Sequence, residues 1–543
     1  MTVTIGFVVR RSGTSRCFFY RSVLVSQFRR TKSIEKLLAD ADAPEHRLRK
    51  TLGPWSLTAL GVGAIIGAGI FVLTGTAAAG ESLETHSLLK APLLSVLLHG
   101  EHAIGMSGRP GAGPAIALSF FLVAVACGLA GLCYAELASM IPIAGSAYTY
   151  TYATLGELVA WIIGWDLILE YAVSNMAVAV GYSAYFDSLL HNLGLSLPAQ
   201  LSEPMLDSSL HFTGSYFNLP GFLVVMILTV ILVIGIRESA GANNFMVAVK
   251  ITAIAIFVIW ASGHVHPSNW VPFMPNGFQG VLTGGAIVFF TYIGFDSVST
   301  AAEECSNPQK DVPFGIIASL VVCTVLYCTV AIVLTGIQNW QTLRNAAPVA
   351  NALAAIGLPG VERWVTIGAL TGMLSSLLVF QLGQARVWFA MSRDGLLPRI
   401  FSKVHRKFRT PHVSTWTAGL FVAIPAGIFN IGTLADLSNI GTLFAFLLVS
   451  LGVLVLRRAQ PDRRRSFRVP WVPLIPIASM ACCLVLMTSL PVETWLRFLV
   501  WLVIGLVIYF TYSRRHSEFA REGSTGSEMT ADRGAGLPGY GQT

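Results

Sequence analysis

Charged residues are scarce in this chain. Asp, Glu, Lys and Arg make up 12% of its 543 residues, whereas a soluble domain carries about 25%. Hydrophobic residues reach 54%, and the mean hydropathy is +0.65. This deficit excludes an ordinary soluble domain, because only half of the usual share of charged surface residues is present. It indicates a membrane protein.

Motifs for enzyme chemistry are missing as well. The sequence has no His/Glu zinc motif, nucleophile elbow or phosphate-binding loop, so we expect neither an enzyme nor a bound metal or cofactor. Seven of the eight cysteines lie in or at the ends of apolar stretches, where they pack as small hydrophobes. Seven of the eleven histidines fall on the side assigned below to the outside, and we interpret them as scattered loop residues.

Long apolar stretches take the place of the missing charge. Twelve of them are long enough to cross a bilayer, which takes a helix of about 20 residues. They cover residues 55–79, 112–140, 156–190, 219–236, 243–263, 278–302, 313–336, 363–391, 412–429, 432–456, 470–490 and 493–512. We therefore predict an all-α polytopic membrane protein with twelve transmembrane helices.

The positions of the basic residues predict the orientation. With both termini inside, 29 Lys and Arg fall on inner segments and five on outer ones, as the positive-inside rule requires. The net charge of +8 is then an orientation signal, and we expect no nucleic-acid partner. The interpretation is a multi-pass protein of the inner or plasma membrane with cytoplasmic termini.

The two ends and one loop stand apart from the spans. Residues 1–54 form a basic tail, in which 33–41 is typical of a short amphipathic helix. Residues 513–543 are rich in Gly, Ser and charge, so we predict a disordered cytoplasmic tail. The outer loop 81–110 is unusually long, and its apolar piece 88–98 is too short to span.

Glycines interrupt the first span at its centre. The stretch GVGAIIGAGIFVLTG runs from Gly61 to Gly75 and holds Gly67, Ala68 and Gly69. If the helix breaks there, unpaired amides at the restart offer a carboxylate site, and the carbonyls before it accept from an ammonium group. A zwitterionic amino acid matches both ends. The alternative is a tight packing face made of small residues, and the pattern alone leaves both open.

A second interrupted span lies at the matching place in the other half of the chain. It reads GGAIVFFTYIGFDSVSTAAEE, with aromatic residues around Gly294 and with Asp296 just beyond. We favour a structural role for Asp296, because the N-terminus of the restarting helix either stabilises its carboxylate or is capped by it. Paired broken helices in corresponding halves are a pointer to the substrate site of a secondary transporter.

Lys250 is the most unusual single residue. It lies seven positions into the predicted helix 243–263, about 10 Å from its inner end by helical rise. A lysine inside a membrane must either extend its amine to the interface or find partners within the bundle. In the second case its ammonium occupies the place of a coupling sodium ion, and burial lets it lose and regain a proton.

Other polar residues occur near the centres of two spans. Asp166 and Glu170 stand one helical turn apart, and Glu170 is placed to face a substrate or to balance Lys250. Ser375 and Ser376 offer hydroxyls to the cation site, or else they bond back to their own helix.

Four long motifs identify a family. GAIIGAGIFVLTG, IPIAGSAYTYTYATLGELVAWIIGWDLILEY, FFTYIGFDSVSTAAEECSNPQKDVPFGI and ARVWFAMSRDGLLP resemble the cationic amino acid transporter family. That family belongs to the amino acid–polyamine–organocation superfamily, and the chain resembles its bacterial twelve-helix type from about Thr31 to His516.

The resemblance implies a LeuT-type fold with two inverted five-helix repeats, 55–263 and 278–457, and two added helices within 470–512. It implies an amino acid bound between the first and sixth helices, and proton symport by alternating access. Lys250 matches a lysine that replaces sodium in proton-coupled relatives. The residues that match the substrate site are Ile65, Ala68, Gly69, Ile70, Phe290, Thr291 and Ile293.

The substrate is less well defined than the family. Met373 falls where we expect the distal wall of the pocket, and a thioether there shortens the pocket against arginine or lysine. We therefore favour small neutral amino acids such as alanine. A cationic amino acid uniporter or exchanger is the alternative, and a membrane sensor without transport is the alternative of another class. The implied partners are the amino acid, protons and the bilayer, with a small membrane subunit left open.

Overall fold

The computed structural model describes residues 31–35, 52–81, 88–100, 102, 109–143, 145–207, 211–234, 239–302, 305–345, 347–408 and 410–518. The predicted amphipathic helix at 33–41 and the predicted disordered tail fall largely outside these residues. Residues 82–87, 101 and 103–108 of the outer loop 81–110 also lie outside them.

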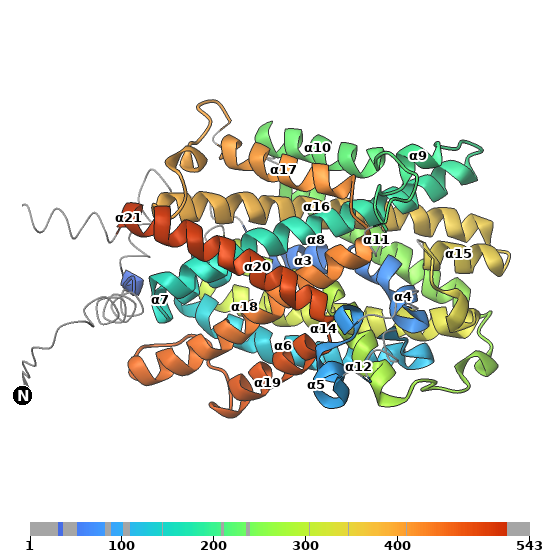
Figure 1. The fold of residues 1–543 in the computed structure, drawn as a ribbon, viewed down its shortest axis with the longest axis horizontal. Helices are drawn as coiled ribbons and strands as arrows, with labels where there is room; N and C mark the ends of the chain where they lie inside the picture. Colours follow the sequence, from blue (N-terminus) through green and yellow to red (C-terminus); the bar gives the residue numbers. More distant parts are fainter. Residues whose placement is uncertain are drawn as a thin grey trace, which may run out of the picture.

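Most of the described chain is helical (Figure 1). The α-helices are α3 (Pro54–Ile65), α4 (Thr74–Ala79), α5 (Leu93–His99), α6 (Ile116–Met140), α7 (Ser146–Thr154), α8 (Glu157–Asn192), α9 (Ala199–Ser202), α10 (Leu219–Ile234), α11 (Ser239–Ser262), α12 (Gly277–Val288), α13 (Ser297–Thr300), α14 (Pro308–Ile337), α15 (Pro348–Ala355), α16 (Pro359–Arg393), α17 (His412–Ala426), α18 (Ile431–Ala459), α19 (Leu474–Thr488), α20 (Val492–Ile508) and α21 (Arg514–His516). Single turns of 3₁₀- or π-helix are η1 (Gly69–Leu73), η2 (Leu88–Lys90), η4 (Gly113–Ala115), η5 (Pro267–Trp270), η6 (Phe289–Tyr292), η8 (Trp340–Thr342), η9 (Arg399–Ser402) and η10 (Tyr509–Ser513). One antiparallel ribbon pairs β1 (Gly80–Glu81) with β2 (Arg109–Pro110).

The predicted spans all contain helix, and the differences lie at their ends. Helix α14 begins five residues before the predicted 313, because Pro308 at its first position starts a helix well and Pro313 is tolerated close to the start. Helix α16 begins in the same way at Pro359, four residues before the predicted 363. The last span continues through η10 and α21 to His516, beyond the predicted 512.

The described helices have the length and composition of a polytopic membrane protein. Eight of them are long and apolar enough to cross a membrane, and nine if α3 and the bent segment after it form one span. Helices α10 and α19 are apolar but shorter, with 16 and 15 residues. The predicted fold class is therefore confirmed as all-α and polytopic, while the count of twelve spans and the repeats stay predictions.

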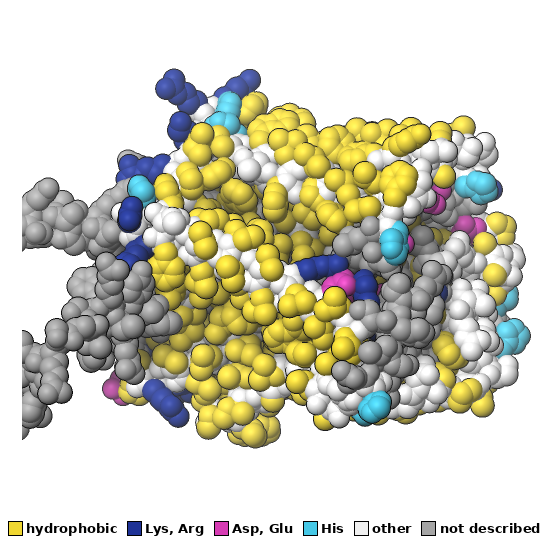
Figure 2. Space-filling view, viewed as in Figure 1, with side chains coloured by type: hydrophobic (Ala, Val, Ile, Leu, Met, Phe, Trp, Pro, Cys, Tyr) yellow, Lys and Arg dark blue, Asp and Glu magenta, His cyan; other side chains and the backbone are white. Residues whose placement is uncertain are grey.

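The helices pack around α8, which is buried along most of its length between α16 and α18 (Figure 1). Helix α14 packs against α6 and α3, and α11 packs against α16. Figure 2 shows a broad hydrophobic surface on the face in view, with Lys and Arg side chains gathered at the end where α21 lies. Such a surface suits contact with lipid, and the basic end is the one that the charge pattern predicts to be inside.

Candidate substrate and cation site

The first span is broken where its glycines predicted a break. Helix α3 ends at Ile65, Ile66 is extended (φ −80°, ψ 92°), and the chain restarts as η1 at Gly69 with a bend of 41°. The first amides of a restarting helix have no partner within it, so η1 presents N–H groups in the buried centre of the molecule. A carboxylate is the group that such amides bind.

The same glycines also allow close packing. A Cβ on Gly69 would lie 2.6 Å from Cγ2 of Thr291, and a Cβ on Gly67 would lie 2.7 Å from Oγ of Ser376. The small residues thus allow both the break in the helix and the close approach of its neighbours, while the carboxylate site stays a prediction.

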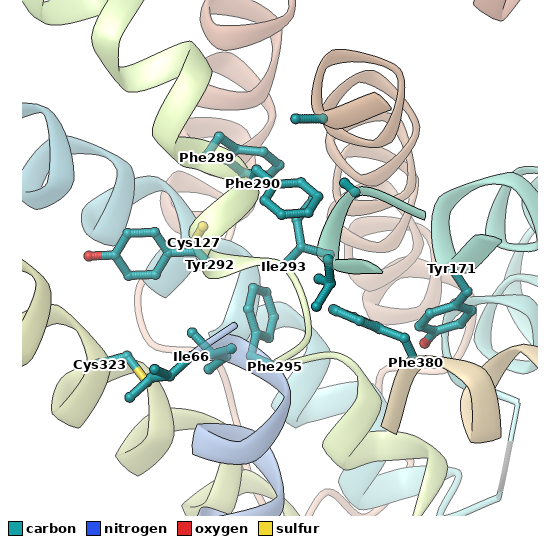
Figure 3. Packing of buried hydrophobic residues seen from close by; sticks show 14 of the residues in the cluster. Ile66, Cys127, Tyr171, Phe289, Phe290, Tyr292, Ile293, Phe295, Cys323 and Phe380 are labelled. Carbon is teal, nitrogen blue, oxygen red and sulfur yellow. The ribbon is translucent and has the colours of Figure 1, made fainter. Parts of the chain in front are cut away.

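The second span is broken beside the first. Helix α12 passes into η6, Ile293 is extended, and Gly294 has φ +119°, a conformation that favours glycine. A Cβ on Gly294 would lie 2.9 Å from Cβ of Ala64 in α3. In the view of Figure 3, Phe295 lies between Ile66 at the first break and Phe380, and Ile293 and Phe290 lie above it. The two interruptions thus meet in one buried region.

Asp296 follows this break and occupies the N-cap position of α13, but its side chain makes no capping hydrogen bond. Its Oδ2 instead accepts hydrogen bonds from the hydroxyls of Tyr171 (2.7 Å) and Ser146 (3.4 Å). These bonds fix the second break to α8 and α7, which agrees with the structural role that the sequence favoured.

Tyr327 of α14 joins the two breaks. Its buried hydroxyl donates to the carbonyl oxygens of Ile65 (2.8 Å) and Thr291 (2.9 Å). A hydroxyl has one proton, so the two carbonyls share it. The sequence analysis missed Tyr327, because one tyrosine in a long apolar helix has no signal that sets it apart.

Lys250 of α11 points into the first break. Its side chain is fully buried, and Nζ donates to the carbonyl oxygens of Gly63 (2.7 Å) and Ile66 (2.9 Å). The interpretation in which this lysine extends to the interface is therefore wrong. The ammonium lies against the end of α3, where carbonyls lacking intrahelical partners carry partial negative charge.

Two serines of α16 complete this cation site. Ser376 Oγ lies 3.0, 3.1 and 3.1 Å from the carbonyl oxygens of Gly63, Ala64 and Ile66, against 3.4 Å to its own helix at Gly372. Ser375 Oγ lies 3.3 Å from the same Gly63 oxygen. Both serines therefore face the break, and Ser376 also lies within hydrogen-bond distance of its own helix.

Asn243 of α11 was not predicted as part of this group. Its Oδ1 accepts from Ser375 Oγ at 3.0 Å. A Cβ on Gly63 would lie only 2.8 Å from the same oxygen, so Asn243 packs directly against the helix that the cation site holds.

Glu170 does not balance Lys250, so that prediction is wrong. No ion pair joins these two described residues, and Glu170 interacts instead with the carboxylates of Asp296 and Asp166. Its carboxylate oxygens are buried without a hydrogen-bond partner in the described structure. It thus belongs to an acidic group on the side of α8, beside the second break.

The remaining predicted residues are buried around the same region. Ala68 packs against α8, where a Cβ on Gly181 would lie 2.8 Å from its own Cβ. Ile70 is fully buried in the first turn after the break. Met373 is fully buried on α16, three residues before Ser376, so it lies on a neighbouring part of the same helix face.

This arrangement defines a class of protein. Two broken helices meet inside a polytopic bundle, and a buried lysine holds one of the breaks. Such sites belong to membrane transporters.

Comparison with known proteins gives the family. The amino acid permease family model matches residues 52–511, and the chain belongs to that family. It is 48% identical over 490 residues to the branched-chain amino acid permease BcaP of Bacillus subtilis, covering 90% of this chain and 98% of the relative. It is 45% identical over 493 residues to the methylthioribose transporter of the same organism, covering 91% and 99%.

A more distant relative is the vacuolar cationic amino acid transporter 4 of Arabidopsis thaliana. It is 36% identical over 441 residues, covering 80% of this chain and 67% of the relative. The predicted family resemblance is thereby confirmed, and the protein is an amino acid permease of the membrane and not an enzyme.

Proposed function

We propose that this permease couples the movement of an amino acid to that of a proton by alternating access. The observation that carries the proposal is the buried ammonium of Lys250, held by two carbonyl oxygens at the first break. A fixed cation there takes the place that a coupling sodium ion occupies in related transporters, and unlike sodium it can release a proton.

In this mechanism the amino acid bridges the two breaks. Its carboxylate binds the amides of Ala68, Gly69 and Ile70 at the start of η1, and its ammonium binds carbonyls near Ile65 and Phe290. Thr291, Ile293 and Glu170 form the opposite wall of the site, which is consistent with the approach of Gly69 to Thr291.

Loss of the proton from Lys250 provides the coupling step. A neutral amine bonds more weakly than an ammonium, so Gly63 and Ile66 are then held chiefly by the hydroxyl of Ser376, which they share. Helix α3 is then free to move against α11 and α16. When the proton returns, the ammonium of Lys250 again bonds the carbonyl oxygens of Gly63 and Ile66.

A LeuT-type architecture supplies the motion. The helices from α3 to α11 and from α12 to α18 form the two five-helix repeats, and α19 and α20 are added after them. The occurrence of one broken helix at the start of each set supports this division.

We propose a substrate with a small or aliphatic neutral side chain. The thioether of Met373 is buried beside the cation site, and it disfavours a long cationic side chain. The relatives above 40% identity include one named for branched-chain amino acids. We extend the proposed range from alanine to branched-chain amino acids on this basis.

Both termini lie on the cytoplasmic side of the cell membrane in this proposal. The described ends meet at one end of the bundle, since Nζ of Lys32 pairs with Glu518 (3.0 Å) and with Asp394 at the end of α16 (3.3 Å). That end also carries the gathered basic side chains (Figure 2), and the positive-inside rule places it in the cytoplasm.

Uptake by the purified protein in liposomes tests this function. Labelled alanine is supplied with an inward proton gradient, alone or with an excess of leucine, methylthioribose or arginine. We expect gradient-driven uptake that leucine inhibits and arginine does not. Inhibition by arginine alone would favour a cationic amino acid carrier. Inhibition by methylthioribose alone would indicate a different substrate class, and binding of the amino acid without uptake would indicate a sensor.

A further inference from the structure

Arg109 forms a buried ion cluster at the end of the bundle opposite the basic end. Its side chain is 3% exposed. Nη1 pairs with Oε2 of Glu81 in β1 at 3.2 Å, and Nη2 pairs with Oδ1 of Asp436 in α18 at 2.7 Å. The guanidinium thus joins the β1–β2 ribbon to a long helix that is distant in sequence.

The four residues from Arg109 to Ala112, here called the strap, also bond to both broken spans. Ala112 N donates to Ala77 O of α4 at 2.9 Å, on the outer half of the first span. Thr283 Oγ1 of α12, on the outer half of the second span, donates to Pro110 O at 2.5 Å, and Asn276 donates to Gly111 O at 2.8 Å. One short segment therefore connects the two outer half-helices and α18.

We propose that the strap is the outer lock of the transport cycle and that Arg109 is the positioning residue that keeps it closed. This inference rests on alternating access in the proposed function. A solute from the outside reaches the breaks only if α4 and α12 separate from α18, and the Arg109–Asp436 contact then has to part.

A buried ion cluster suits a lock with two states. Charges attract strongly in a dry environment and weakly in water, so the closed strap is held firmly, and entry of water on opening removes most of the attraction. Burial by itself lowers the pKa of Arg109, but the carboxylates of Asp436 and Glu81 outweigh burial and raise its pKa. The guanidinium keeps its charge, and the lock opens by separation and hydration rather than by loss of a proton.

Accessibility of the site from the outer side tests the lock. The parent protein has its eight cysteines replaced by serine and carries Thr291→Cys as a probe at the second break. Arg109→Gln and Asp436→Asn are introduced separately and labelled with a membrane-impermeant thiol reagent from the outside. Lys90→Gln is the matched control, because Lys90 pairs with Glu493 of α20, at the same end of the molecule but on an unbroken helix.

We expect both lock variants to label faster than the parent and the control, by about 5- to 150-fold, the range of ordinary conformational coupling. The external KM and the maximal rate should both fall, because the outward-open state becomes more populated and closes less readily. Equal labelling rates in all four proteins would overturn the proposal. Asp436→Asn retains the Arg109–Glu81 pair, so it still tests the lock if Arg109→Gln does not fold. Labelling needs no substrate, so the labelling rates test the lock whichever solute the protein carries.

Discussion

Replacing Lys250 with methionine removes the ammonium but keeps most of the length and volume of the side chain. The two carbonyls that it holds keep one shared donor, since Gly63 O and Ile66 O remain 3.0 and 3.1 Å from Ser376 Oγ. The variant loses two charge-assisted hydrogen bonds, about 1.5–3 kcal/mol each, and it no longer buries a charge, which costs several kcal/mol. These terms oppose each other, so we expect the free energy of unfolding to change by no more than about 2 kcal/mol.

The effect on coupling is much larger. One titratable cation carries one proton per cycle, and a gradient of one pH unit is then worth about 1.4 kcal/mol, or a tenfold accumulation of substrate. The wild-type protein should reach about this ratio in liposomes with the membrane potential held at zero. Lys250→Met should only equalise the two sides, while still exchanging labelled for unlabelled substrate.

Exchange is the control that separates loss of coupling from loss of fold. The measurement is the steady-state ratio of labelled amino acid inside and outside, with and without the pH gradient. If Lys250→Met accumulates substrate as well as the wild type does, Lys250 is not the coupling site and the reasoning fails.

Three further predictions concern the same region. Met373→Ser should lower the inhibition constant of arginine by about tenfold, measured by competition against alanine uptake, while Met391→Ser on the same helix should not. Tyr327→Phe leaves two carbonyls without their shared donor and should weaken amino acid binding by about 1–2 kcal/mol, or five- to thirtyfold; an unchanged Kd in calorimetry would show that it does not set the site. Gly294→Ala should lower the free energy of unfolding by about 1–3 kcal/mol in denaturant titrations, whereas Gly128→Ala, which meets no atom within 4 Å, should be nearly neutral.

Features that depend on neighbours in sequence were well predicted. The two breaks follow from glycines within long apolar stretches, because a helix interrupted at bilayer depth needs residues without a side chain and a cavity to line. The helical spans follow from the length of the apolar stretches, and their errors lie at ends where proline starts a helix earlier than hydropathy does.

Features that depend on contacts between distant segments were not predicted. Lys250 was identified by its cost in a membrane, but its acceptors in α3 are more than 180 residues away. The packing of the helices likewise places Glu170 near Asp296 rather than near Lys250, and no local sequence pattern indicates this. Arg109 appeared in the sequence only as one of a few outer basic residues, because nothing local indicates that it reaches Asp436.

Substrate-driven proton movement tests the central claim most directly. Wild-type protein is reconstituted in liposomes that contain a pH-sensitive dye, with equal pH on both sides and the potential held at zero, and alanine or leucine is added outside. The account predicts acidification of the lumen in step with amino acid uptake, at about one proton per molecule, and no acidification with Lys250→Met. Amino acid uptake by the wild type without acidification would contradict it.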